Sequence, residues 1–409
     1  MLVSVAKVVI KNEEWRMMNE ELRMNNGEKQ EQQKKLPPTE YVQKLEKRTL
    51  DEEIQQLCDW KADWKDRSSE GLGLTTQITL GDAWKALLRK SGLQKVTVQS
   101  DIQMDKDTVT GQGIVLLNDQ KAVHFNAFHD GTQKRAVGES GGVSCLQIPE
   151  LKEDYLMLET ELTEALFVPM GTEVTFKSEM QKWIGMFWQK GQTVAKSRED
   201  VKPKGITDAC TEYDIVYHTG EFMTNKYSMV WKKMKLYVDE SDTIRGRVIE
   251  LMVDNVDYSV TIVRNNTKKE YREDISLKAA DSSVTYTFKL SLTKDEKYPT
   301  LKIDVLAGKD RLFLAELSQK AVAKDQKQSL QKLRTTGEKT MEAAQKDRDK
   351  TNGKDGMEKY FWLYGNKKNT DGMTLTHYLY GVDIPAFLNK IKEKCGVDLT
   401  QLAQKFDDY

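Results

Sequence analysis

The chain has 409 residues, which is enough for two or three domains and at least one sizeable hydrophobic core. Its 63 basic and 64 acidic side chains give a formal net charge of -1, so no overall field attracts nucleic acid or an anionic membrane. Hydrophobic residues make up only 38%, which indicates a folded body that carries solvated helical or flexible segments.

The cysteines and the first residues bear on the cellular compartment. The four cysteines are far apart and form no CxxC pair, so the sequence predicts neither a disulfide framework nor a structural zinc site. The start, MLVSVAKVVI, has no basic region before its apolar residues and no cleavage site after them. No stretch reaches the roughly 18 to 20 apolar residues of a membrane span. We expect a cytoplasmic protein without a transmembrane segment, although export without a cleavable signal stays open.

Residues 1–92 are expected to form a helical N-terminal region. The charged stretch 11–67 has helical character, and a heptad repeats within 13–26. Two heptads are short for a coiled coil, which favours a solvated helix with one apolar edge. A second helix is predicted to begin near Thr39, and a compact helix should occupy 81–92.

Residues 93–312 are expected to form a β-rich domain. Short runs with β-branched or aromatic residues are separated by turn residues, without regular helical spacers. In 284–291, apolar and polar side chains alternate, the pattern of a sheet with one wet face. The predicted fold class is therefore α+β, with a central, mainly antiparallel, sandwich- or barrel-like β domain flanked by charged helical segments.

A helix is predicted to interrupt this domain at 178–190. It places Trp183, Phe187 and Trp188 on one apolar stripe. Such a stripe usually belongs to a core, and the alternative is an exposed interaction site.

Residues 313–356 are expected to be a charged helix or linker, with no aromatic residue in 318–356, and 347–358 resembles a degenerate EF-hand-type calcium loop. Position 6 of the loop is Asn352 in place of glycine, and Lys354 stands at an apolar position. A solvated linker is therefore the favoured interpretation, with calcium as the alternative. The five oxygen ligands of the calcium alternative would be Asp347, Asp349, Thr351, Asp355 and Glu358.

Residues 357–409 are expected to form a small aromatic and helical unit. Asp383 is predicted to cap a helix that Gly396 ends.

The only motif that suggests a nucleophile is VGESGGVSC (137–145), which contains G-x-S-x-G around Ser140. An esterase elbow needs a hydrophobic strand before the serine and a helix after it, and neither flank fits. His124 and His129 precede Ser140 too closely for the two-barrel arrangement of a serine protease. We therefore expect a glycine turn between two strands.

Other catalytic constellations are missing from the sequence. His124 and His129 are five residues apart, so on one strand they point to opposite faces. No phosphate-binding glycine motif occurs. The chain is expected to be a non-enzymatic structural or protein-interaction protein that binds a protein partner or itself. The alternative is a ligand- or glycan-binding β protein, with a hydrolase site on its loops as one form of it.

Overall fold

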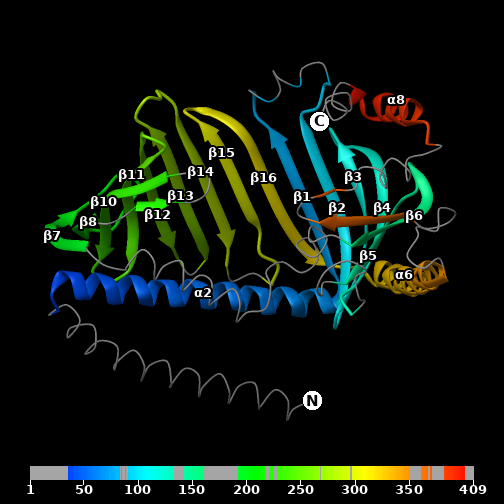
Figure 1. Ribbon diagram of the computed structural model, residues 1–409, viewed down its shortest axis with the longest axis horizontal. Coiled ribbons are helices and arrows are strands. Elements are labelled where there is room, and N and C mark those ends of the chain that lie inside the picture. The colour runs from blue at the N-terminus through cyan, green and yellow to red at the C-terminus, as the bar shows by residue number, and fades with distance from the viewer. Residues whose placement is uncertain are drawn as a thin grey trace, which may run out of the picture. The chain divides into compact units, whose positions relative to one another are not determined.

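The chain is described by a computed structural model (Figure 1). The described residues are 36–82, Trp84, Leu88, 91–132, 142–159, 192–217, 221–223, 228–267, 269–294, 297–350, 361–366, 369–370 and 382–400. The chain divides into two compact units: unit 1 comprises 1–55, 182–264 and 279–281, and unit 2 comprises 56–181, 265–278 and 282–409. Over the part of the chain described, no helix is both long and apolar enough to cross a membrane.

Unit 1 contains an antiparallel sheet with the strand order β7–β8–β10–β11–β12, and β9 pairs with the first residues of β10. At the β11–β12 turn, Asp254 and Asn255 have φ values of 49° and 69°, as a two-residue hairpin turn requires. The strands are β7 (Gln192–Val201), β8 (Cys210–Tyr217), β9 (Glu221–Met223), β10 (Ser228–Asp239), β11 (Ile244–Val253) and β12 (Val256–Asn266).

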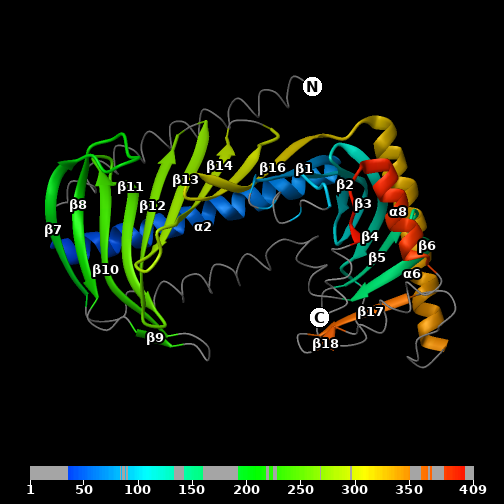
Figure 2. The ribbon, with the colours of Figure 1, turned by 90° about the horizontal axis from the view of Figure 1, so that it is seen from above.

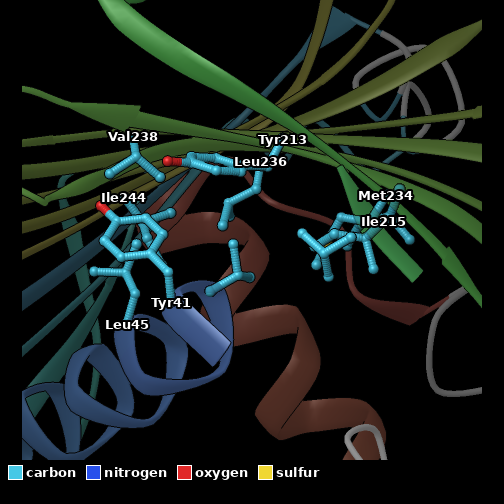
Figure 3. Packing of buried hydrophobic residues seen from close by; sticks show 11 residues of the cluster. Tyr41, Leu45, Tyr213, Ile215, Met234, Leu236, Val238 and Ile244 are labelled. Carbon is cyan, nitrogen blue, oxygen red and sulfur yellow. The ribbon is translucent and has the colours of Figure 1, made fainter. Parts of the chain in front are cut away.

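The core of unit 1 lies between this sheet and the first half of helix α2 (Pro38–Glu70). Tyr41, Val42 and Leu45 share one face of the helix and are buried against the strands. Figure 3 shows Tyr41 and Leu45 beside the strand residues. The Tyr41 hydroxyl also donates to Asp242 Oδ1 at 2.7 Å. The strands contribute alternate inward-facing residues: Val194, Tyr213, Ile215, Met234, Leu236, Val238, Ile244 and Ile249.

Unit 2 contains a sheet with the order β13–β14–β15–β16–β1–β2–β3–β4–β5–β6–β17. Its pairings are antiparallel except for β6 with β17, and β18 pairs with β17 alone among the described strands. The strands from the first part of the chain are β1 (Leu72–Leu80), β2 (Lys95–Asp105), β3 (Thr108–Leu117), β4 (Gln120–Asp130), β5 (Val143–Ile148) and β6 (Lys152–Glu159). Those from the second part are β13 (Glu270–Ala279), β14 (Thr285–Thr293), β15 (Leu301–Ala307), β16 (Asp310–Ala321), β17 (Phe361–Asn366) and β18 (Asn369–Thr370).

Two helices pack on the sheet of unit 2. Helix α6 (Lys324–Lys350) lies alongside β2 to β5 (Figure 2), and it buries Met341 and Ala344 against Phe128. Helix α8 (Ile384–Cys395) packs against the β3–β4 hairpin. The side chain of Asp383 accepts a hydrogen bond from the Ala386 amide at its start.

The predicted α+β class with a mainly antiparallel β domain is confirmed. The helix expected near Thr39 is α2, and the predicted cap at Asp383 and the left-handed stop at Gly396 are both present. Two features differ from expectation. Strand β1 lies within residues 1–92, which were expected to be helical, because it is held between β2 and β16, and β16 lies far along the chain. Helix α6 buries Leu330, Met341 and Ala344, so one side of it packs on the sheet.

Candidate functional site

The structure describes few of the residues singled out in the sequence. Ser140 lies outside the described residues, between β4 and β5, which pair with each other. The stripe of Trp183, Phe187 and Trp188 also lies outside them. Of the five calcium-loop positions, Asp347 and Asp349 fall within the last turns of α6. Thr351, Asp355 and Glu358 lie outside the described part. These site predictions therefore stay predictions.

A serine and a histidine do meet in unit 2, but as part of its interior. His129 Nδ1 lies 2.9 Å from Ser144 Oγ, and each residue is 1% exposed. A nucleophile must be reachable by its substrate, so this pair is structural. Burial also raises the pKa of the Cys145 thiol to about 12, which keeps it in the unreactive protonated form.

A cavity of about 280 Å³ in unit 1 is lined by several carboxylates, and at least two of them serve the fold. Asp239 accepts bonds from the turn residues Ser241 and Thr243 and from Arg245 at 2.6 Å. Asp242 accepts from Tyr41, and burial together with this bond raises the pKa of the Tyr41 phenol. Among the residues that the structure places, no three His, Cys, Asp or Glu side chains gather as metal ligands would.

One feature of unit 2 is the side of the sheet formed by β13, β14, β15, β16 and β1 that we call the apolar face. Cross-strand registers align its side chains in rows that continue from strand to strand. The row Ile275–Phe288–Val305–Phe313–Leu80 crosses all five strands. The row Leu290–Ile303–Ala315–Ile78 begins at β14, because Glu273 of β13 lies opposite Leu290, and the row Tyr271–Leu292–Leu301–Leu317 ends at β16, opposite Thr76 of β1.

The other side of the same strands is polar. Arg311 pairs with Asp304 at 2.7 Å, and Lys302 pairs with Glu316 at the same distance. Ser276 and Thr287 lie opposite each other at 3.2 Å. The alternation read from 284–291 is thus confirmed, and the sheet has one apolar and one charged side.

One end of the apolar face is exposed. Tyr286 and Phe288, at the start of β14, each keep 43% of their surface exposed, and Ile78, three strands away on β1, keeps 37%. The opposite end of β14 lies near α2, since Lys297 in the loop after β14 pairs with Glu70, the last residue of α2. Aromatic side chains of this size are rarely left half exposed together without a role.

A second feature of unit 2 lies on the polar side of β1 to β4, beside the start of α6. It is a concavity of about 360 Å³, which we call the polar groove. Its lining includes the polar side chains Thr75, Gln99, Asp101, Gln112, His124, Asn126 and Lys320.

The sequence identified His124 but missed the other groove residues and the extent of the apolar face. The sequence shows apolar and polar residues alternating within single strands, but it does not show the registers that place residues of neighbouring strands opposite each other. Comparison with known proteins adds no assignment: no family model and no curated protein matches the chain significantly.

Proposed function

We propose that this chain is a non-enzymatic protein-interaction protein that self-associates through the exposed end of its apolar face. The observation that carries this proposal is the half exposure of Tyr286 and Phe288 on a continuous apolar surface. Burying such side chains against another protein removes apolar area from water, which favours association by roughly 25 cal/mol per Å² before the costs of binding.

A second copy of the chain fits this surface for two reasons. A two-fold contact places the same patch on both partners, and an apolar patch is complementary to itself. In addition, the formal net charge of -1 produces almost no repulsion between copies. A different apolar protein partner is the competing outcome of the experiment below.

Sedimentation measurements over a range of protein concentrations test this proposal. The wild-type protein should shift from monomer to dimer, and Tyr286→Lys should raise the dimer dissociation constant at least about tenfold. The dimer is weakened because a lysine buried at the contact carries an unpaired charge. Phe288→Lys should act in the same direction.

Thr287→Lys is the matched control, since it adds the same side chain to the same strand on the polar side. It should leave the dimer unchanged, and thermal melts should show that all variants fold. A strictly monomeric wild-type protein would overturn self-association. Equal weakening by Thr287→Lys would show that the apolar face is not the contact.

A further inference from the structure

The polar groove is built from side chains that face one another across neighbouring strands. Asp101, Gln112 and Asn126 occupy directly opposed positions on β2, β3 and β4. Gln99, Ile114 and His124 form the next row on the same side of the sheet. Two rows of side chains, all of them polar except Ile114, therefore converge on one concavity.

Glycine at position 73 helps to keep the groove open. Gly73 lies on β1 between Lys320 of β16 and Asp101 of β2. A Cβ atom there would lie 3.0 Å from Lys320 Cγ and 3.2 Å from Asp101 Oδ1. Any other residue would crowd the two charged side chains, so the glycine leaves room between them.

Several groove side chains are oriented by partners outside the groove. Ser329 of α6 donates to Gln112 Oε1 at 2.8 Å, and the Gln112 side chain also bonds Asp101. Asn126 Nδ2 donates to Gln147 Oε1 at 3.0 Å. These bonds fix the amide orientations, which is the support that a binding site needs and a freely solvated surface lacks.

His124 is held in the same way by Glu150. Its ring Nδ1 contacts the Glu150 carboxylate, which also accepts the His124 backbone amide at 2.9 Å. Nε2 is the ring nitrogen that lies outside this contact, and the side chain of His124 remains 44% exposed. The imidazole thus adds an oriented polar group to the groove lining.

The composition of the groove selects among ligand classes. Asp101 and Lys320 balance each other in charge, and Lys320 is the one basic lysine or arginine in the lining. A phosphate or nucleotide would need more positive charge than this. The groove instead supplies hydrogen-bond donors and acceptors together, from amides, a carboxylate, a hydroxyl and an imidazole. This mixture matches a ligand with neighbouring hydroxyl groups, each of which both donates and accepts. The volume of about 360 Å³ is near the lower end for ligand sites, so the ligand must be small.

We infer that the polar groove binds a small neutral saccharide, with Gln99, Asp101, Gln112 and Asn126 hydrogen-bonding its hydroxyls and Ile114 contacting its C–H groups. This inference goes beyond the proposed self-association and does not depend on it, since the two features lie on opposite sides of the strands. Burial raises the pKa of the Asp101 carboxyl, with Lys320 opposing it.

Methyl-labelled isoleucine in the full-length protein provides the test, because Ile114 is the isoleucine in the groove lining. Glucose, galactose, mannose and N-acetylglucosamine are titrated separately to about 50 mM, well above a dissociation constant of roughly 1 mM. At least one sugar should shift the Ile114 signal in a saturable way. Gln112→Leu should raise the dissociation constant of that sugar at least about tenfold, because a sugar hydroxyl would lose an oriented hydrogen-bond partner.

Gln331→Leu is the matched control, since it makes the same change at an exposed position of α6. It should leave binding unchanged. Gln99→Leu, at an exposed groove position, tests the site again should Gln112→Leu fail to fold. No saturable shift with any of the four sugars, or binding that neither groove variant weakens, would overturn the inference. Titrations with glycine and inorganic phosphate complete the experiment: a saturable shift of Ile114 with either, but with no sugar, would also overturn it.

Discussion

At the scale of single residues, Glu212 carries a clear electrostatic signature. Its side chain is only 2% exposed, and it accepts bonds from Arg198 at 2.9 Å and Lys235 at 3.1 Å. Burial opposes ionisation, but the bonds from Arg198, Lys235 and Ser197 outweigh it and lower the pKa of Glu212 to about 2. Because this pKa lies below the ordinary value of about 4.3, the ionised carboxylate stabilises the fold at pH values above about 4.3. Its contribution is lost as the pH falls toward the folded-state pKa.

Glu212→Gln should therefore lower the free energy of unfolding by about 1 to 3 kcal/mol at neutral pH, as measured by urea denaturation. The difference between wild type and variant should shrink as the pH falls through about 4 toward about 2. Asp214→Asn is the control, because Asp214 is 43% exposed and lies 3.5 Å from Lys235. A loss of less than about 1 kcal/mol is expected there. Equal losses in the two variants would contradict this role for Glu212.

At the scale of elements, local signals in the sequence predicted the ends of helices and, for β14, which side chains lie on the apolar side and which on the polar side. The start of α2 and both ends of α8 depend on nearby proline, aspartate and glycine residues, so a single segment contains the information. Strand β1 could not be found in this way, since it is completed by β16 and β2. The groove was missed for the same reason: Asp101 and Gln112 are ordinary polar residues until the register places them opposite each other.

The packing of α6 provides a prediction at this scale. A Cβ atom at Gly337 would lie 2.5 Å from Cγ of Phe128, a ring that is 1% exposed and cannot move aside freely. Glycine to alanine in a helix usually gains about 1 kcal/mol, whereas overpacking costs about 1 to 3 kcal/mol. Gly337→Ala should therefore destabilise the protein on balance, as measured by the urea midpoint. The exposed α6 change Gln331→Ala should be neutral or slightly stabilising, and a stabilised Gly337→Ala would refute the close contact.

At the scale of the whole molecule, the charged helices are parts of the folded units and cannot serve as detachable arms. The first half of α2 supplies Tyr41, Val42 and Leu45 to the core of unit 1, and α6 supplies Leu330 and Met341 to the interior of unit 2. Deleting residues 1–67 or 318–356 would remove core side chains along with any contact surface. Loss of self-association in such deletions would therefore not identify an interface, which is why single substitutions on the apolar face are the sharper test.

Leu45→Ala tests the structural role of α2 directly. Leu45 is 2% exposed and packs among the residues of β8, β10 and β11. Truncating a buried leucine removes apolar contacts and leaves a cavity, at a cost of about 2 to 5 kcal/mol. Hydrogen exchange should then quicken at the backbone amides of β8 and β10, since their pairing depends on the covered face. Lys44→Ala, one residue earlier on the exposed side of the helix, should leave those rates nearly unchanged. Unchanged exchange rates in Leu45→Ala would contradict the role of α2 in stabilising the pairing of β8 and β10.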